Sequence, residues 1–405
     1  MGMADPPPLP ALERALRAIL SPAMAGRAAA LEALGADDWR VLEQRMVDHR
    51  LEPLVGWLVR EDPALAARLP VSLAERLASG ARAEAIHALA EQHALVTTVG
   101  HLEKAGLQPM ALKGACIAFT AYPEPGLRQM RDLDLLLEDE AATLAAFRTL
   151  VAQGFVRYGD DRGDPAASLH ASHQLPPLVS PDGNHLVELH HRVGHGAGQD
   201  AWSGTLHARA GRLRLLDAEL IVPSPEDQIV HLVRHAAVDH RFDNGPLTVS
   251  DLHFLTRSMP IDRKELAAAA ARAGVARETD LLLHMAREAW ENVNERADPD
   301  MARGAAAAWA LMLADPAAVR TSRIHEGLRG VPGSLTRRLL PDRARLAREQ
   351  GAVETPAQHG WALVRHWGAL IARRGPAFLA RAAGPREDEA LAAFRDWQAD
   401  GAARP

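Results

Sequence analysis

The pattern of hydrophobic and polar positions changes twice along the chain and divides it into three regions. Over residues 11–97, and again from residue 223 onward, apolar residues recur at helical spacing. Between these regions, short apolar runs alternate with turn residues, which predicts strands mixed with helices. We therefore expect an α+β fold with a small mixed-sheet core. The expected boundaries are a disordered N-terminus at 1–10, a helical lead-in at 11–97, the core at 98–222 and a helical C-terminal region at 223–405.

Several expected helices carry terminal signals. Asp37 and Asp38 are candidate caps for a helix in the lead-in. A further helix is expected over residues 71–102, with Gly106 as a C-cap. Ser224 followed by Pro225 predicts the start of the first helix of the C-terminal region, because serine caps helices and proline favours the first helical position.

In the central region the periodicity changes from helical to extended. Residues 108–112 form a short apolar run and predict a buried strand, and residues 114–122 suit a helix packed against it. Over residues 132–137 leucines alternate with Asp132 and Asp134, the period-2 pattern of a strand. Both carboxylates are therefore expected to project from the same face of that strand.

A second strand pair is expected further along the chain. Residues 174–179 and 185–190 are apolar runs that flank a Pro-Asp-Gly turn, which predicts a hairpin. On the second strand of this hairpin, Glu188 and His190 share one face. A carboxylate in an otherwise apolar run is a candidate functional group, although it could also face solvent or pair with an arginine.

Composition and charge exclude several classes of protein. The net charge is −6 and the chain has one cysteine, Cys116, so a broadly basic nucleic-acid surface and a disulfide framework are both excluded. The net charge does not exclude a local basic groove. The N-terminus lacks a secretory signal pattern, and no apolar run reaches the length of a membrane span, so we expect a soluble, cytoplasmic protein.

The aspartate pair is the sharpest candidate site. Two carboxylates on one strand face can bind Mg²⁺ or Mn²⁺ while leaving coordination positions for substrate phosphates. A third carboxylate on a neighbouring strand would complete a two-metal site, and Glu188 is the candidate. His190 is a candidate to support these ligands from the same face.

A basic turn precedes the aspartates. Lys113 and Gly114 follow directly on the first strand, where a glycine lets phosphate approach the backbone and a lysine adds positive charge. A plain strand-to-helix turn is the alternative. Arg128 and Arg131 are candidates for phosphate binding. Their alternative is a salt bridge to an acidic neighbour: Glu124, Asp132 or Asp134.

Two other patterns favour structural roles. His231, His235 and Asp239 follow each other at one-turn spacing and could hold a metal, but the H-E-x-x-H pattern is absent. Cys116 lies between apolar neighbours and is interpreted as a buried small residue. The stripe of Trp361 and Trp367 is interpreted as part of a core.

With these residues identified, the sequence resembles a known family. Leu112-Lys113-Gly114, Tyr122-Pro123, Arg128 and Asp132-Leu133-Asp134 follow one another as in the uncharacterised nucleotidyltransferase family. This family is a bacterial branch of the polymerase-β-like nucleotidyltransferases. The later segments 187–193 and 223–240, and Ser250-Asp251-Leu252, are similar to its acidic strand and its helical region. The resemblance covers roughly residues 37–259.

The resemblance implies a function and a set of ligands. Asp132 and Asp134 would bind metal, with Glu188 as the third carboxylate. The implied reaction is Mg²⁺-dependent (or Mn²⁺-dependent) transfer of a nucleoside monophosphate from an NTP, with ATP the expected nucleotide, to an unknown hydroxyl or phosphate acceptor. The acceptor could be a small molecule, a peptide or a protein. Where this chain has Lys113-Gly114, the wider superfamily usually has glycine-serine contacting the triphosphate.

Two alternatives come from other classes. One is a non-catalytic nucleotide-binding or regulatory protein built on a nucleotidyltransferase fold. The other is a metal-dependent phosphohydrolase that uses His231, His235 and Asp239.

Overall fold

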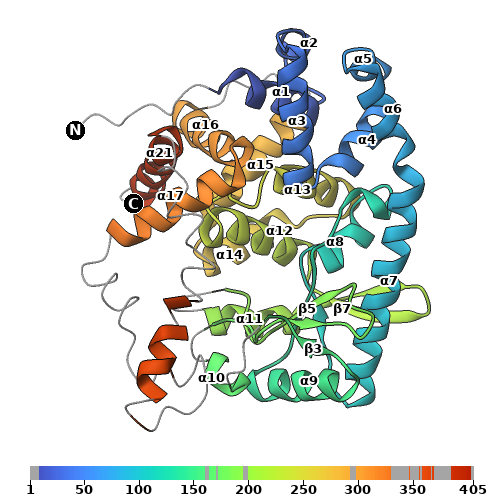
Figure 1. Cartoon of the computed structure of the whole chain (residues 1–405), viewed down its shortest axis with the longest axis vertical. Helices are drawn as coiled ribbons and strands as arrows, with labels where there is room; N and C mark the ends of the chain where they lie inside the picture. Colours follow the sequence, from blue (N-terminus) through green and yellow to red (C-terminus); the bar gives the residue numbers. More distant parts are fainter. Residues whose placement is uncertain are drawn as a thin grey trace.

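The computed structural model describes residues 9–159, 164–169, 172–194, 199–291, 298–329, 346, 355, 358–365, 367–368 and 385–402. A mixed sheet occupies one half of the molecule and helices from both ends of the chain occupy the other (Figure 1). The predicted α+β fold with flanking helical regions is therefore confirmed.

The sheet combines parallel and antiparallel pairs. Its strands are β1 (Met110–Ala111), β2 (Asp132–Leu136), β3 (Val156–Arg157), β4 (Leu178–Val179), β5 (Leu186–His190), β6 (Gly211–Leu215) and β7 (Ala218–Val222). In the described part of the chain they lie in the order β3-β4-β5-β2-β1-β7-β6. The central pairs β2–β5 and β1–β7 are parallel, and the other neighbours are antiparallel. The predicted strands at 108–112 and 132–137 and the predicted hairpin around the Pro-Asp-Gly turn are confirmed.

One hairpin was not predicted. β6 and β7 pair antiparallel and extend the sheet beyond β1. The helices that alternate with the strands are α8 (Gly114–Thr120), the short η1 (Pro125–Leu127), α9 (Glu140–Ala152), α10 (Pro165–Leu169) and α11 (Gln199–Ala208).

The N-terminal region is helical, as predicted, but two of its helix ends differ from the prediction. Its helices are α1 (Ala11–Leu20), α2 (Arg27–Glu32), α3 (Ala36–Asp48), α4 (Glu52–Glu61), α5 (Pro63–Ala66), α6 (Val71–Ser79) and α7 (Ala81–Lys104). Gly35, and not Asp37 or Asp38, is the N-cap of α3; Asp38 accepts a 2.9 Å hydrogen bond from the Gly35 amide. The helix expected over 71–102 is divided at Gly80, where α6 ends and α7 begins.

The C-terminal region is also helical. It contains α12 (Pro225–Arg234), a π-helical turn η2 (His235–Asp239), α13 (Leu247–Ser258), α14 (Arg263–Arg272), α15 (Ala276–Trp290), α16 (Pro299–Leu313), α17 (Pro316–Arg329) and α21 (Pro385–Ala402). Ser224 caps α12 as predicted, since its hydroxyl accepts a hydrogen bond from the Asp227 amide.

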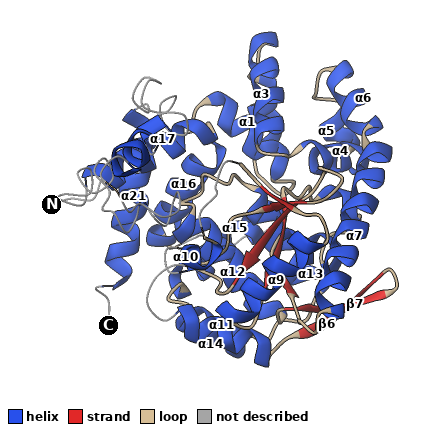
Figure 2. Ribbon diagram, turned by 60° about the horizontal axis from the view of Figure 1, so that its bottom comes forward, coloured by secondary structure: helices blue, strands red, loops and turns tan. Residues whose placement is uncertain are grey.

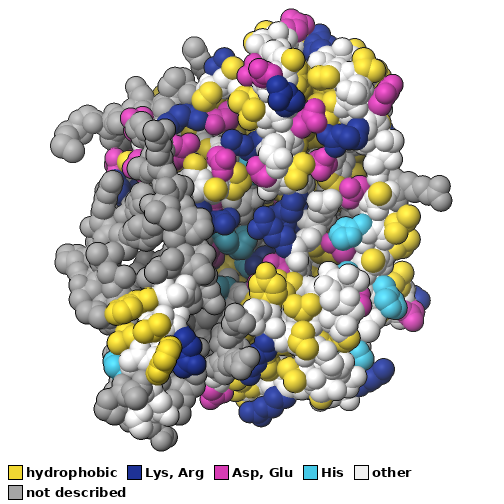
Figure 3. Space-filling model, viewed as in Figure 1, with side chains coloured by type: hydrophobic (Ala, Val, Ile, Leu, Met, Phe, Trp, Pro, Cys, Tyr) yellow, Lys and Arg dark blue, Asp and Glu magenta, His cyan; other side chains and the backbone are white. Residues whose placement is uncertain are grey.

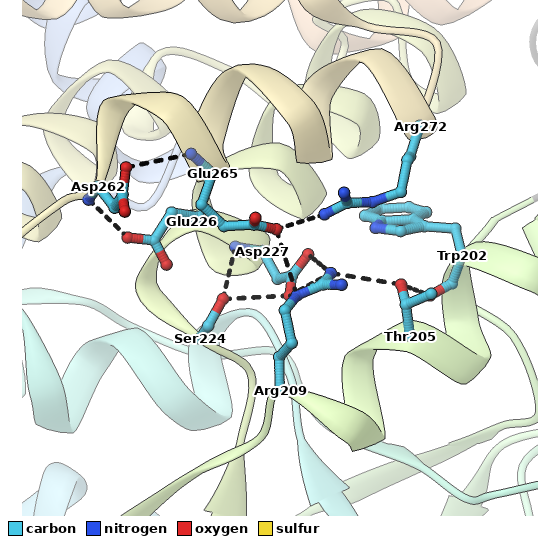
Figure 4. A network of polar contacts seen from close by, with 9 residues as sticks. All are labelled: Trp202, Thr205, Arg209, Ser224, Glu226, Asp227, Asp262, Glu265 and Arg272. Carbon is cyan, nitrogen blue, oxygen red and sulfur yellow. Dashed lines mark hydrogen bonds and ion pairs between the residues drawn. The ribbon is translucent and has the colours of Figure 1, made fainter.

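A polar network fixes α12 against its neighbours (Figure 4). The guanidinium of Arg209 binds both carboxylate oxygens of the fully buried Asp227, at 2.6 and 2.7 Å through Nη2. The Asp262 amide donates to Glu226 at 2.8 Å. Because Arg209 directly follows α11 and Asp262 precedes α14, these bonds join three helices, and α12 is held firmly above the sheet.

The two faces of the sheet have different partners. Leu133 and Leu135 of β2 and Val187 and Leu189 of β5 are buried in a hydrophobic cluster with residues of α7 and α9. The alternate positions, which include Asp134, point to the opposite face. A larger cluster joins the N-terminal helices with the C-terminal helices. Figure 2 shows the strands among the helices that form these two clusters. The polar face of the sheet therefore lies towards the helical half.

One prediction about packing is wrong. Trp361 is 69% exposed and Trp367 is 40% exposed, so the stripe that they form does not belong to a core among the described residues. None of the described helices combines the length and the apolar character that crossing a bilayer requires.

Candidate metal and phosphate site

The carboxylates come together through the register of β2 and β5. These parallel strands place Asp134 directly beside Glu188, and Leu136 beside His190. Because alternate residues of a strand share one face, Asp132 and Asp134 project from the same side of β2 as Glu188 and His190 do from β5. Local alternation and strand pairing are thus sufficient to gather these four side chains at one place.

Asp134 is as deeply buried as His190, the other fully buried member of the group. It is 1% exposed, and its Oδ1 accepts a hydrogen bond from Lys113 Nζ at 2.8 Å. The same oxygen lies 2.8 Å from His190 Nε2, which itself lies 3.7 Å from Glu188 Oε2. His190, expected to support the carboxylates, therefore contacts both Asp134 and Glu188. Its Nδ1 is buried and has no hydrogen-bond partner among the described atoms.

The electrostatics of the site are dominated by burial and by excess negative charge. Burial would raise the pKa of Asp134, but the ammonium of Lys113 and the hydrogen bond from His190 hold that pKa well below its usual range. Burial, and then the charge of Asp134, raise the pKa of Asp132 to about 6 and that of Glu188 to about 7. Three carboxylates thus share the nearby ammonium of Lys113, which favours the binding of a further cation.

Lys113 reaches Asp134 from a strained backbone. Its φ of 46° and ψ of −125° lie in a region that normally holds glycine. Next to it, Gly114 has no room for a side chain, because an added Cβ would lie 2.9 Å from Met130 Cγ. The turn between β1 and α8 is therefore shaped closely around these two residues. Strain of this kind is concentrated at functional sites.

A cavity of about 1130 Å³ opens above these residues. Its floor is the polar face of β2 and β5, and its other walls come from the N-terminal and C-terminal helical regions. Figure 3 shows basic and histidine side chains gathered in a hollow near the centre of one face of the molecule. The charged residues that line the cavity away from the sheet include Arg50, Arg131, Asp239, Arg241, Asp243, Arg320, Arg323 and Arg395.

Arg128 is held by an acidic residue that the sequence interpretation did not consider as its partner. Its Nε and Nη2 bind the two oxygens of Asp251 at 3.0 and 3.2 Å, and Tyr122 donates to the same carboxylate at 2.6 Å. The alternative partners of Arg128 suggested by the sequence, which lie close to it in the chain, are therefore wrong. Arg131, in contrast, is exposed at the edge of the cavity.

The second histidine group does not form a metal site in the described structure. His231 and His235 line the cavity with ring centroids 6.4 Å apart, and Asp239 lies 3.6 Å from Arg234. The group whose ligand atoms lie close enough to share a metal is Asp134, Glu188 and His190, within 4.8 Å of one another. Within the described residues, the ligand atoms of His231, His235 and Asp239 do not lie this close to one another.

Comparison with known families agrees with this geometry. The sequence model of the family described as "Uncharacterised nucleotidyltransferase" matches residues 35–291, which is more than half of the chain. The chain belongs to this family. The match begins in the N-terminal helical region and extends beyond the segment of the sequence resemblance. None of the curated proteins compared with the chain matches it.

Membership of the uncharacterised nucleotidyltransferase family supports a nucleotidyltransferase-like function. The residues that make the family recognisable in this sequence form two groups in space. Lys113 and Asp134 belong to the carboxylate site. Tyr122, Arg128 and Asp251 form the adjacent buried cluster, which ties the loop before β2 to α13.

The donor set fits a divalent cation. Carboxylate oxygens suit Mg²⁺ and Mn²⁺, and an imidazole nitrogen is accepted more readily by Mn²⁺ than by Mg²⁺. Asp134, Glu188 and His190 offer such a set, and the neighbouring Asp132 adds a carboxylate on the same face.

The sequence interpretation missed Arg50. It follows α3, distant in sequence from the aspartates, and lines the same cavity. Nothing in the local pattern around Arg50 indicates that position, because tertiary packing brings it there: α4, which begins two residues after Arg50, packs against η1 in the loop before β2.

Proposed function

We propose that this protein transfers a nucleoside monophosphate from an NTP, with ATP the expected nucleotide, to a hydroxyl or phosphate acceptor with the help of Mg²⁺ or Mn²⁺. The observation that carries the proposal is the register of β2 and β5, which sets Asp134 beside Glu188 at the floor of a large cavity. Family membership supports the same class of reaction.

In the proposed reaction, an acceptor oxygen forms a bond to the α-phosphorus and the bond to the β-phosphate oxygen breaks, releasing pyrophosphate. A bound divalent cation would supply the positive charge that stabilises the phosphates. Asp132, Asp134 and Glu188 would hold it. Glu188, which is more exposed than His190, would also take the proton of the acceptor.

Lys113 has a distinct role in this proposal. Its ammonium is hydrogen-bonded to Asp134 Oδ1, so a metal that bound this oxygen would compete with the lysine for it. An ammonium displaced from Asp134 stays close to the cavity and is available to a phosphate group. Arg131, exposed at the edge of the cavity, is a second candidate for phosphate binding. Arg128 would act mainly by fixing the loop, because Asp251 already engages it.

The test is transfer of label from α-³²P-labelled ATP, together with binding of ATP in the presence of Mg²⁺ or Mn²⁺. Glu188→Gln and the double variant Asp132→Ala/Asp134→Ala are compared with the wild-type protein. The expected result is a loss of metal-dependent nucleotide binding in both variants. Asp217→Asn, in the exposed turn between β6 and β7, is a matched control and should behave like the wild type.

Unchanged metal and nucleotide binding in the double variant would refute the proposal. Metal-dependent ATP binding with no transfer to any acceptor would favour the non-catalytic alternative. A tightly bound transition metal that is lost in His231→Ala, but kept in Glu188→Gln, would favour the phosphohydrolase alternative instead.

A further inference from the structure

Arg50 occupies a backbone position that suits glycine. Helix α3 ends in a Schellman motif, in which the Arg50 amide donates to Val47 O at 2.9 Å and the Leu51 amide to Met46 O at 2.8 Å. In this motif the residue just after the helix, here Arg50, takes a left-handed backbone conformation. Arg50 has a φ of 57°. A left-handed conformation costs a non-glycine residue free energy that glycine avoids. The fold therefore loses stability by having an arginine here.

The side chain of Arg50 adds a second cost. Its Nε is buried and has no hydrogen-bond partner among the described atoms. Burial, and then the positive charges of Arg128 and Arg131, lower the pKa of Arg50 to about 10. A guanidinium that is desolvated beside two other guanidinium groups is unfavourable unless an anion is close to it.

The acidic residues near Arg50 have other partners. Asp251 accepts bonds from Arg128 and Tyr122. Asp132 lies beside Asp134 on β2 and supplies a favourable negative charge to Arg50, but in the proposed function it would bind metal instead. Arg131 lines the same cavity, is exposed, and is close enough to Arg50 for its charge to lower the pKa of Arg50. Arg50 and Arg131 thus present two cationic groups to the cavity on the side of Asp132.

We propose that Arg50 and Arg131 form a phosphate subsite that binds the terminal phosphates of the nucleotide and the departing pyrophosphate. This inference rests on the proposed nucleotidyl transfer, both for the identity of the ligand and for the engagement of Asp132 by metal. Arg50 would act as a substrate-binding residue that the N-terminal helical region contributes to the site on the sheet. The backbone strain and the unpartnered Nε are then compensated only when the ligand is bound.

The experiment measures stability and anion binding together. Arg50→Gly removes both the strain and the buried charge, so its melting temperature should equal or exceed that of the wild type. Its affinity for Mg²⁺-pyrophosphate and Mg²⁺-ATP, measured by calorimetry, should fall by about 10-fold or more, since a bond between charged groups is lost. Its affinity for AMP should be unchanged, because AMP lacks the terminal phosphates.

Leu216→Gly is the matched control for strain. Leu216 also has a left-handed backbone, with a φ of 54°, but it is 52% exposed in the turn between β6 and β7. This variant should keep or gain stability and bind pyrophosphate like the wild type. Arg50→Lys keeps a positive charge without the guanidinium and should bind pyrophosphate with intermediate affinity.

The outcomes separate this inference from the proposed function. Wild-type affinity for pyrophosphate in Arg50→Gly, or a lower melting temperature of that variant, would overturn the inference. If the wild type binds ATP and Arg50→Gly binds it equally well, the proposed function stands and the subsite does not. If the wild type binds pyrophosphate through Arg50 but transfers no nucleotide, the subsite stands alone. A wild type that binds neither ligand overturns both.

Discussion

Lys113 Nζ donates a 2.8 Å hydrogen bond to Oδ1 of Asp134, and the two side chains are 14% and 1% exposed. The ammonium stabilises a carboxylate that burial would otherwise protonate. The carboxylate in turn stabilises the ammonium, because Asp134 raises the pKa of Lys113 in spite of burial. A buried ion pair of this kind at the floor of the candidate metal site would couple folding to metal binding if the site binds a cation.

Lys113→Met should lower stability and strengthen metal binding. The variant leaves Asp134 buried with only His190 as a partner, which should cost about 3 kcal/mol in the free energy of unfolding. It also removes the competitor for Oδ1, so Mn²⁺ should bind more tightly and restore the melting temperature. Thermal unfolding with and without Mn²⁺ measures both effects. Equal Mn²⁺ affinity in the variant and the wild type would show that lysine and metal do not compete.

Asp251→Asn should weaken the connection between the loop before β2 and α13. The change leaves the buried guanidinium of Arg128 without its counter-charge, for an expected loss of about 3 kcal/mol. A double-mutant cycle with Arg128→Met, measured by urea unfolding, should give a large coupling energy. Tyr122→Phe removes one hydrogen bond and should cost about 1–2 kcal/mol. Additive losses for Asp251 and Arg128 would contradict this interpretation.

Stability should fall below pH 6.5 through His49. Burial, and then the charge of Arg45, lower the pKa of His49 from 6.5 to about 4, and its Nε2 contacts Ala314 O. Between these pH values the unfolded chain takes up a proton that the folded chain does not, so the free energy of unfolding falls by up to about 3 kcal/mol as pH decreases.

Urea unfolding at a series of pH values measures this effect. His49→Gln keeps a donor for Ala314 O and should show a shallower loss of stability between pH 6.5 and 4. His93→Gln, on the exposed side of α7, is the control. An equally steep loss in His49→Gln would place the proton uptake at another group.

Two helical glycines should respond to alanine in opposite directions. A Cβ at Gly56 would lie 2.5 Å from the backbone oxygen of Leu77, so Gly56→Ala must separate α4 from α6 and should destabilise the fold by about 1–3 kcal/mol. At Gly100, in α7, nothing lies within 4 Å of the added atom. Gly100→Ala should therefore stabilise by about 0.5–1 kcal/mol through helix propensity. Calorimetric melting of both variants checks the contrast, and a destabilised Gly100→Ala would contradict it.

The parts of the fold that were predictable depend on local patterns. Alternation along residues 132–137 and the Pro-Asp-Gly turn before β5 each report a strand within a few residues, so β2 and β5 were found together with the faces of Asp134 and Glu188. The β6–β7 hairpin also alternates, with Arg212 and Arg214 at every second position beside Leu213 and Leu215, and that signal was available but not used.

The parts that were not predictable depend on distant contacts. Asp251 follows Arg128 by more than a hundred residues, and no local pattern pairs them. Arg50 reaches the cavity because α4, which begins two residues after it, packs against η1 in the loop before β2. Whether β2 lies next to β5 could not be read from either strand, since register between parallel strands depends on the whole sheet. The residue types of the site were therefore predictable, and its walls were not.

The shared core of the two helical regions limits how the chain can be divided. His49 binds Ala314 O and Arg45 binds Leu313 O, so the family segment 35–291 depends on residues that lie outside it. Glu13 and Arg386, near opposite ends of the described chain, form an ion pair. A fragment cut to the family boundaries would expose leucines that α1 and α16 now cover. For expression and crystallisation, the smallest dependable unit therefore extends from α1 to α21.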